Sequence, residues 1–410
     1  MKSRKLRTIL VVIVAFAMVF AFTACGNGDD GGGAATGNGG GGEATDDGET
    51  IRIGMFGPYT GAVAHFGIAV REGATLYIEQ RNAAGGINGR LIEVFEWDDE
   101  HDSLRALTGY NWLLDQGVTA IIGGVTSGPT MAVVPQAFQD NMPMITASAT
   151  HAGVTYNAEE GIVFTNMFRA CFIDPFQGQK MAEFARDVLG AETAAVMVNT
   201  GVDYSIGLQE AFVARAAEIG LEVVTVQSYG VDAVDFTSQL TIIANMNPDV
   251  LFIPDYFSII ALMAPQAASV GVQSTLLGPD GWDGIADAMD DLSTLEGSFY
   301  MSGFSVEDET PMVQEFIGRF QQRWGHQPNM FSAQGYDAAM ILFAAIEQVE
   351  RTTDYVQGSD EYRTAIINAM AATNLTGVTG HITYDRYNNP IKTAVIVEIE
   401  GGAPRFWGNF

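Results

Sequence analysis

The chain has 410 residues, of which 47% are hydrophobic and 17% are charged. This composition supplies enough apolar surface for a large buried core and excludes a disordered chain, and the length corresponds to about two domains. The 49 acidic side chains outnumber the 20 basic ones, so the net charge is −29. Such an excess of negative charge argues against a nucleic-acid partner.

Residues 1–24 have the pattern of a secretory signal peptide. A basic start is followed by an apolar run over residues 9–22, which is shorter than the roughly 20 residues of a membrane-spanning helix. The four residues that end at Cys25 resemble the bacterial lipobox, in which the Cys after the cleavage site receives a lipid. We therefore expect a lipid on Cys25, with an ordinary signal peptide as the alternative.

Residues 25–50 are mostly Gly, Asp, Ala and Thr, a composition that predicts a flexible tether. With a lipid on Cys25, the tether would hold the folded part outside the cytoplasm at the bacterial cell membrane. Cys171 is then the only other cysteine, so no intramolecular disulfide is expected. Its apolar neighbours indicate a buried, unreactive thiol.

From residue 51 onward, short apolar runs alternate with segments of helical periodicity. This alternation is typical of parallel sheets flanked by helices. In the first half, the predicted strands are 51–56, 91–97, 118–122 and 142–146. The predicted helices are 69–78 with an end at Gly85-Gly86, 103–116, and one that starts near 129. Positive φ angles at the two glycines would suit the end of the first helix.

A second series of the same kind follows a predicted loop at residues 147–167. Its predicted strands are 193–199, 221–227 and 249–254, and its predicted helices are 204–219, 235–246 and 258–270. The remainder contains helices near 311–324, 334–350 and 360–372 and strands at 380–384 and 391–399. Two α/β halves of this kind predict doubly wound parallel sheets with a cleft between them.

The sequence lacks the motifs of common catalytic and metal sites. The five His residues are scattered, no HExxH motif occurs, and residues 124–128 do not match GxSxG. The acidic residues between 98 and 102 lack the spacing of a Ca²⁺ loop, and we interpret them as a solvated acidic loop. We therefore expect no enzyme activity, no metal and no cofactor.

Small hydroxylated residues follow two predicted strands of the first half. Residues 123–130 leave one strand and open a helix, and residues 146–150 follow the next strand. Backbone N–H groups and hydroxyls at such positions can bind a carboxylate, and ligands gather at the carboxyl ends of strands in doubly wound sheets. Ser and Thr are also common N-caps, so the spacing alone leaves both interpretations open.

Residues 278–283 form the counterpart in the second half. Asp280 stands in a Gly/Pro-rich turn beside Trp282. Such a carboxylate can face an ammonium group while the aromatic ring covers apolar ligand surface. A turn in which Asp280 only accepts local hydrogen bonds is the alternative interpretation.

Taken together, these segments resemble the leucine-, isoleucine- and valine-binding proteins of branched-chain amino-acid ABC transporters. The resemblance runs from about residue 51 to 400. The matching motifs are Gly57-Pro58-Tyr59-Thr60-Gly61, Asn82-Ala83-Ala84-Gly85-Gly86-Ile87-Asn88-Gly89-Arg90, Asp98-Asp99, Ile121-Ile122-Gly123-Gly124, Phe168-Arg169 with Asp174-Pro175, Gln266-Ala267, and Gly278-Pro279-Asp280-Gly281. The string from Asn82 to Arg90 is the most specific of them.

The resemblance implies the α/β fold of type I periplasmic binding proteins. In that fold, two doubly wound parallel-sheet lobes are joined by a hinge of three chain crossings and close around a solute. Transferred to this sequence, lobe 1 comprises residues 51–167 and 303–380, and lobe 2 comprises residues 168–302 and 381–410. The implied partners are a small-molecule ligand and ABC permease subunits, and a monomer is expected.

The resemblance also implies the residues that bind the ligand. Ser127, Gly128, Ser148 and Thr150 match the positions that bind the ligand's carboxylate, and the Ser148 carbonyl and Thr150 hydroxyl share its ammonium. Asp280 matches an acidic residue that pairs with the ammonium. Four aromatic residues match positions near the ligand or its side chain: Phe66, Tyr204, Tyr256 and Trp282.

Three of these positions depart from the usual residues of the family. Ser148 replaces Ala, Gly128 replaces a hydroxyl residue, and Phe66 replaces a frequent Tyr. Asp280 and Thr150 preserve the recognition of an α-amino acid, whereas the side-chain specificity stays open.

We therefore expect an extracytoplasmic solute-binding receptor that captures an amino acid, branched-chain or related, for an ABC importer. One alternative is the same receptor for a short amide, urea or an aromatic carboxylate. A ligand sensor is another alternative. An extracytoplasmic enzyme is disfavoured because the sequence lacks a catalytic constellation.

Overall fold

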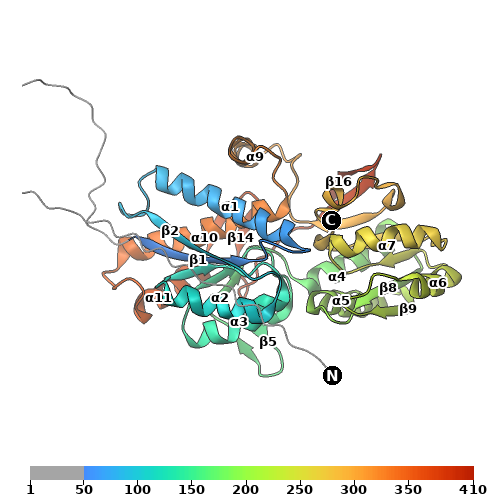
Figure 1. Cartoon of the computed structure of the whole chain (residues 1–410), viewed down its shortest axis with the longest axis horizontal. Coiled ribbons are helices and arrows are strands. Elements are labelled where there is room, and N and C mark those ends of the chain that lie inside the picture. Colours follow the sequence, from blue (N-terminus) through green and yellow to red (C-terminus); the bar gives the residue numbers. More distant parts are fainter. Residues whose placement is uncertain (1–49) are drawn as a thin grey trace, which may run out of the picture. The chain divides into compact units, whose positions relative to one another are not determined.

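Two separate sheets organise the computed structural model, which describes residues 50–410 (Figure 1). The predicted signal peptide, Cys25 and the tether up to residue 49 lie outside the described residues. Among residues 50–410, no helix is both long enough and apolar enough to cross a membrane. Each sheet is described below with the helices that pack on it, as the five-stranded unit and the seven-stranded unit.

The five-stranded unit is built on a parallel sheet with the strand order β2-β1-β3-β4-β7. Its strands are β1 (Ile51–Gly57), β2 (Ile92–Asp98), β3 (Ala120–Ile122), β4 (Met144–Thr146) and β7 (Met167–Arg169). Its helices are α1 (Ala64–Ala83), α2 (Ser103–Asp115), α3 (Ser127–Gln139), α9 (Pro311–Trp324), α10 (Met330–Thr352) and α11 (Asp360–Ala371). Although α10 comes late in the sequence, it packs along α1 and contacts β3 and β4 (Figure 1).

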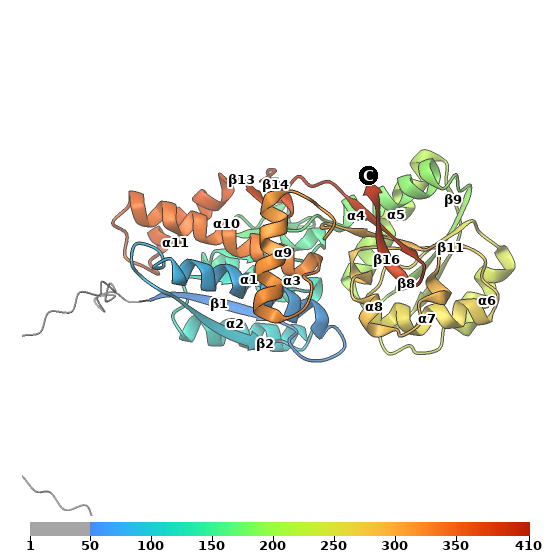
Figure 2. The ribbon, with the colours of Figure 1, turned by 90° about the horizontal axis from the view of Figure 1, so that it is seen from above.

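The seven-stranded unit has the strand order β16-β15-β12-β11-β10-β8-β9. Its parallel strands are β8 (Thr193–Asn199), β9 (Glu222–Tyr229), β10 (Val250–Phe252), β11 (Thr275–Gly278) and β12 (Phe299–Ser302), and its antiparallel edge consists of β15 (Val395–Glu400) and β16 (Ala403–Asn409). Its helices, seen from above in Figure 2, are α4 (Asp174–Glu183), α5 (Asp203–Ile219), α6 (Thr237–Met246), α7 (Phe257–Ser269) and the short α8 (Ile285–Ala288).

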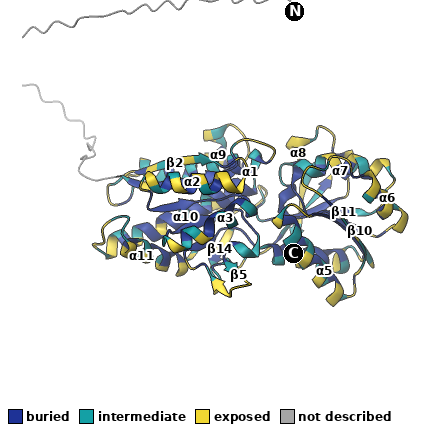
Figure 3. Cartoon of the chain, turned by 60° about the horizontal axis from the view of Figure 1, so that its bottom comes forward, coloured by how far each residue is buried: buried dark blue, intermediate teal, exposed yellow. Residues whose placement is uncertain are grey.

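Burial along the strands explains why the sequence forms these layers. Every residue of β3, β4 and β10 is buried, and so is nearly all of β8. Parallel strands that helices cover on both faces are expected to be this apolar. The edge strand β9 instead consists of exposed and part-buried residues, except for its buried last residue, Tyr229. Figure 3 shows the same gradient, with buried strands inside and exposed residues on the outer helix faces.

The chain passes between the two units three times. It leaves β7 for α4 over residues 170–173, returns from β12 to α9 over residues 303–310, and reaches β15 after β13 (Asn374–Gly377) and β14 (Gly380–Thr383). The β13–β14 pair is held by the buried Asp337 of α10, whose carboxylate accepts hydrogen bonds from the backbone N–H groups of Val378 and Thr379. Three segments that are far apart in sequence therefore form the connection.

Most of the predicted elements are present, with shifts of a few residues at their ends. Gly85 and Gly86 have φ angles of 97° and 73°, as predicted for the end of α1. The predicted loop 147–167 contains a small hairpin of β5 (Tyr156–Asn157) and β6 (Ile162–Val163), and α4 was not expected. The apolar patterns of β5, β6 and α4 are too short or too weak to be recognised in the sequence.

The interpretation of residues 98–102 as a solvated loop is wrong for Asp99. Its side chain is fully buried and accepts a hydrogen bond from the backbone N–H of His101. Burial raises its pKa to about 7. The adjacent Asp98 accepts hydrogen bonds from the Tyr59 N–H and the Thr60 hydroxyl. The cluster therefore fixes the loop after β1 to the end of β2.

Candidate functional site

A small cavity lies where the two units meet, and both contribute to its wall. The five-stranded unit supplies Phe66, Val125, Thr126, Ser127, Ser148, Thr150 and Phe331. The seven-stranded unit supplies Tyr204, Tyr256, Asp280 and Gly281. The cavity has a volume of about 10 Å³, which is room for about one water molecule.

The wall from the five-stranded unit is made of hydroxyls and backbone at the ends of β3 and β4. Ser127 is the first residue of α3, and its hydroxyl accepts a hydrogen bond from the His151 N–H at 3.2 Å. The Ser148 hydroxyl donates to the Val125 carbonyl at 2.7 Å. Because parallel strands end at one edge of the sheet, the loops after β3 and β4 bring these residues together.

The start of α3 is open to an anion. Thr126 is its N-cap residue, but its side chain makes no capping hydrogen bond. The Thr126 hydroxyl instead lies 2.9 Å from Nδ1 of His101. The first N–H groups of a helix have no partner within the helix, and the helix dipole adds positive potential there. This wall is therefore neutral in formal charge and rich in donors.

The wall from the seven-stranded unit carries a buried carboxylate. Asp280 is 2% exposed. Its Oδ1 accepts a hydrogen bond from the Tyr204 hydroxyl at 2.6 Å and another from the Gln177 side chain at 2.9 Å. Gln177 also accepts from the Asp280 N–H, and the Tyr204 oxygen accepts from the Gly281 N–H. The turn that holds Asp280 is thus fixed by two side chains.

The protonation of Asp280 reflects a balance between burial and hydrogen bonding. Burial raises the pKa of Asp280 to about 6, while the hydrogen bonds from Tyr204 and Gln177 oppose the increase. A positive charge in the cavity would favour the ionised form further. Among the described residues, no group of three His, Cys, Asp or Glu side chains is placed to hold a metal ion.

A second buried carboxylate, Asp174, lies behind the cavity at the start of α4. Its side chain is fully buried, and the neighbouring Thr150 hydroxyl favours its ionised form. Burial raises the pKa of Asp174 well above its ordinary value, and the charge of Asp280 raises it further. Asp174 lines a neighbouring pocket and not the cavity itself, and the charge of the buried Arg169 opposes the increase of its pKa.

Aromatic rings enclose the rest of the cavity. Tyr204 and Tyr256 are stacked with ring centroids 4.9 Å apart. Phe66 lies 5.4 Å from Tyr256 and 4.5 Å from Phe331, measured between centroids. Phe66 comes from α1 and Tyr256 from the loop before α7, so this contact joins the two units. The rings give the cavity an apolar surface, although the hydroxyl of Tyr204 binds Asp280.

Seven of the nine predicted ligand-binding residues line this cavity, and two do not. Trp282 points into the core of the seven-stranded unit, where its Nε1 donates to the Ile253 carbonyl at 3.0 Å. Its ring covers Gly278 so closely that a Cβ there would lie 2.2 Å from the ring. Gly128 lies one residue further along α3 than the lining Ser127. Cys171 is buried, as predicted, and burial raises the pKa of its thiol to about 12.

Sequence reasoning missed several residues of the site. Val125, Thr126 and Gly281 are direct neighbours of predicted residues, so the segments were right and the individual positions incomplete. Asp174 was noted only as part of a motif. Phe331 lies just after the first residue of α10, and the sequence has no local signal that brings it to this cavity. Its position depends on the packing of α10 against α1.

Comparison with known proteins agrees with this architecture. Residues 50–403 match the periplasmic binding protein family. The chain belongs to this family. It is 26% identical to a Leu/Ile/Val-binding protein homolog of Brucella melitensis over 304 residues, which are 74% of this chain and 80% of that protein. Members of the family are extracytoplasmic solute-binding proteins, so the predicted family and receptor function are confirmed.

Solved structures show the same fold. The leucine-binding protein LivK from Thermotoga maritima matches with a TM-score of 0.79 and 29% identity over 88% of this chain and 99% of LivK. LivJ from Streptococcus pneumoniae, solved in complex with isoleucine, matches with a TM-score of 0.76 and 26% identity over 87% of this chain and 98% of LivJ. The periplasmic binding protein type I fold predicted from the sequence is therefore confirmed. These relatives are binding proteins of transporters rather than enzymes.

Proposed function

We propose that this periplasmic binding protein captures an α-amino acid for an ABC importer, with a branched-chain amino acid as the first candidate. The observation that carries the proposal is the buried Asp280, which faces a wall of hydroxyls and backbone donors across a small cavity. An α-amino acid has one anionic and one cationic group on the same carbon. The two walls offer complementary groups for both.

Each end of the ligand then has its own partners. Ser127 and the open start of α3 would donate hydrogen bonds to the carboxylate. The Asp280 carboxylate and the buried Thr150 hydroxyl, which lines the cavity, would accept from the ammonium. The side chain would lie against Phe66 and Tyr256. The relatives support this assignment because one is named for Leu, Ile and Val and another was solved with isoleucine.

Capture requires movement of the two units. The cavity has room for about one water molecule, so an amino acid enters only when the rings of Phe66 and Tyr256 separate. We propose that residues 51–167 with 303–380 and residues 168–302 with 381–410 move as two lobes about the three chain crossings. Closure over the ligand would present a combined surface to the permease subunits.

A thermal-shift screen of residues 44–410, which include all of the described residues, tests the proposal. The screen contains the common amino acids, short amides, urea and benzoate. A ligand at 1,000 times its Kd stabilises the folded state by about 4 kcal/mol. We expect a shift with a small group of related L-amino acids and none with their α-hydroxy analogues. A shift only with compounds that lack an α-amino group would contradict the role of Asp280.

One observation favours a second class of ligand. The pKa of Asp280 is about 6, so its protonated form is accessible near neutral pH and can donate a hydrogen bond. A carbonyl oxygen of an amide or urea would suit such a donor. In the screen, this second candidate predicts stabilisation by amides that is larger at pH 5 than at pH 7.

We further propose that a lipid on Cys25 anchors the mature protein, as a monomer, to the outer face of the cell membrane. The apolar run before Cys25 and the Gly/Asp-rich tether after it support this. The test is detergent phase partitioning of the full chain expressed in bacteria. We expect the wild type in the detergent phase and the Cys25→Ser variant in the aqueous phase. Equal partitioning of the two proteins would argue against the anchor.

A further inference from the structure

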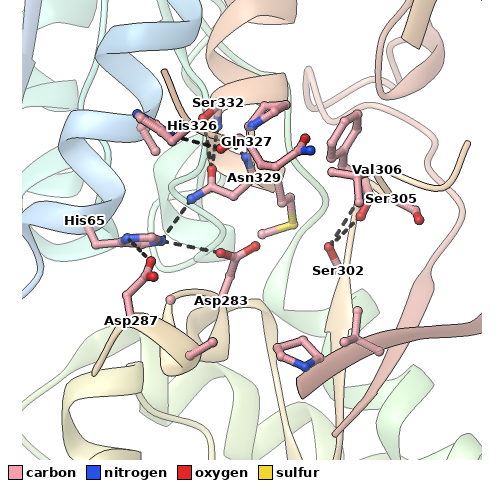
Figure 4. A pocket seen from close by; sticks show the side chains of 18 of the residues that line it. His65, Asp283, Asp287, Ser302, Ser305, Val306, His326, Gln327, Asn329 and Ser332 are labelled. Carbon is pink, nitrogen blue, oxygen red and sulfur yellow. Dashed lines mark hydrogen bonds and ion pairs between the residues drawn. The ribbon is translucent and has the colours of Figure 1, made fainter. Parts of the chain in front are cut away.

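A second contact between the two units lies outside the cavity, in a wide pocket of about 710 Å³ (Figure 4). The central residue of this contact is His65, which lies on α1 of the five-stranded unit and is next to Phe66 of the cavity wall in the sequence. Asp283 and Asp287 approach His65 from the seven-stranded unit, and Asn329 approaches from the N-cap of α10. No group of this contact lines the cavity itself.

The hydrogen bonds around His65 determine which nitrogen carries its proton. Oδ1 of Asn329 accepts from the Ser332 N–H at 2.9 Å, so the Asn329 amide nitrogen faces Nε2 of His65 at 2.9 Å and donates to it. Neutral His65 therefore carries its proton on Nδ1, which lies 3.6 Å from Asp287. Nε2 also lies 3.4 Å from Asp283. When Nε2 also carries a proton, it can no longer accept the hydrogen bond from Asn329. It would then form an ion pair with Asp283.

The ring of His65 is packed tightly against the opposite unit. It meets the ring of Phe257 edge-on, with centroids 5.4 Å apart. A Cβ at Gly284 would lie 2.8 Å from the His65 ring, so the imidazole fills the space that a side chain at this position would need. These contacts exist only while the two units are together.

Carboxylates dominate the charges that face His65. Asp283 and Asp287 face it from the seven-stranded unit and Glu72 from its own helix, while Glu72 also contacts His326 at 3.3 Å. Arg405 is the cationic side chain on the β16 side of the pocket. Burial lowers the pKa of His65, but the hydrogen bond with Asp283 and the charges of the three acids raise it above its ordinary value.

We propose that His65 is a proton-dependent latch: its imidazolium holds the two units together through Asp283 and Asp287 and so couples ligand capture in the neighbouring cavity to pH. The proposal extends the proposed function by adding regulation to it, and the latch itself acts on closure with or without a ligand.

The direction of the pH effect follows from linkage. When the units separate, His65 loses the two aspartates of the opposite unit and its pKa returns toward the ordinary value. The closed state therefore binds the proton more tightly. Its extra stability is complete below the pKa of the open state and disappears as the pH rises through the pKa of the closed state. Protonation of Asp280 near pH 6 weakens the binding of an ammonium, which is opposite to the effect of protonating His65. The latch is therefore measured above that pH.

The test compares binding of L-leucine to residues 44–410 at about pH 6.5 and about pH 8.5 by calorimetry. We expect the Kd of the wild type to increase by about three- to tenfold over this range. In His65→Gln, the Kd is expected to be nearly the same at both values, and in Asp283→Asn the increase is expected to be smaller than in the wild type. A wild-type pH response in His65→Gln would overturn the proposal.

His381→Gln is the matched control, because His381 is exposed on β14, pairs with Thr376 of β13, and lines neither the cavity nor the pocket around His65. It should keep the wild-type response. Small-angle X-ray scattering without ligand separates the latch from the proposed function. We expect the radius of gyration of the wild type, but not of His65→Gln, to increase at the higher pH. If L-leucine binds at neither pH, leucine is ruled out as the ligand while the scattering still tests the latch, and identical scattering responses of the two proteins would overturn the latch.

Discussion

The two walls of the cavity differ in which polar groups they bury and in how those groups are stabilised. On the five-stranded side, hydroxyls such as Ser148 are partnered by backbone carbonyls, and no formal charge is buried in the wall. On the seven-stranded side, Asp280 is a buried acid held by Tyr204 and Gln177. The first wall is set by the ends of two strands, whereas the second depends on side chains from α5, α4 and a turn.

Because of this difference, we expect the two walls to respond differently to pH and to substitution. Hydroxyls and backbone donors do not titrate near neutral pH, so the first wall should bind its part of the ligand equally well over a broad pH range. The second wall contains an acid with a pKa near 6. Affinity, selectivity for an ammonium and pH dependence should therefore follow substitutions in the second wall much more than in the first.

The largest effect is expected for Asp280→Asn. The variant keeps the size of the side chain but removes the negative charge from a desolvated site. We expect the affinity for an amino acid that the screen identifies to fall about 100-fold, or about 3 kcal/mol. Calorimetry measures the change, and Asp232→Asn serves as the charge-matched control at pH 6.5, because Asp232 is an exposed acid that lines neither the cavity nor the pocket around His65. Equal losses in both variants would show that the two walls do not differ as described.

Tyr204→Phe should give the next largest effect and should also change the pH profile. The variant removes a 2.6 Å hydrogen bond to Asp280, and we expect about a tenfold loss of affinity. In the wild type, binding of an ammonium declines as the pH falls through about 6, because Asp280 becomes protonated. Without the Tyr204 hydroxyl, the pKa of Asp280 rises, so the decline should begin at a higher pH. An unchanged midpoint would contradict this coupling.

Ser127→Ala tests the neutral wall. The variant removes one hydroxyl and leaves the backbone donors at the start of α3 in place. We expect the affinity to fall about three- to fivefold, with the same dependence on pH as the wild type between pH 5 and 8. A loss as large as that of Asp280→Asn, or a shifted pH profile, would mean that the carboxylate end of the ligand depends on this hydroxyl more than on the helix.

Trp282→Phe should have the smallest effect on binding. The indole donates to the Ile253 carbonyl inside the seven-stranded unit and does not line the cavity. We expect the free energy of unfolding to decrease by about 1–3 kcal/mol, measured in urea, and the Kd to change by less than about twofold. A large change in Kd with little loss of stability would restore the role near the ligand that the sequence alone suggested for Trp282.

Long elements with clear periodicity could be predicted from the sequence. The strand at residues 193–199 and the helix at 311–324 agree with β8 and α9 at both ends. The short buried strands β3, β4 and β10 were predicted within slightly longer apolar runs, whereas the four-residue strands β11 and β12 were not predicted. The helix α4 begins with Asp-Pro and contains Gly178, which leaves its apolar pattern weak. Its start nevertheless places Asp174 next to the site.

The residues of the site can also be divided into those that the sequence predicts and those that it does not. Residues that follow strands, such as Ser148, were predictable because the ends of parallel strands converge. Trp282 and Phe331 show what local sequence does not contain. The ring of Trp282 turns toward the core because Gly278 leaves room for it, and Phe331 reaches the cavity because α10 crosses from a distant part of the chain to pack on α1. Both depend on contacts between distant segments.

The buried thiol of Cys171 has a practical consequence. Because it is buried and its pKa is raised to about 12, it should resist maleimide reagents under native conditions, and the chain from residue 44 onward contains no other cysteine. Cysteines introduced on the outer helices of the two units would therefore accept fluorescent dyes without prior removal of the native one. A donor and acceptor pair placed in this way would convert the protein into an optical reporter of its own ligand.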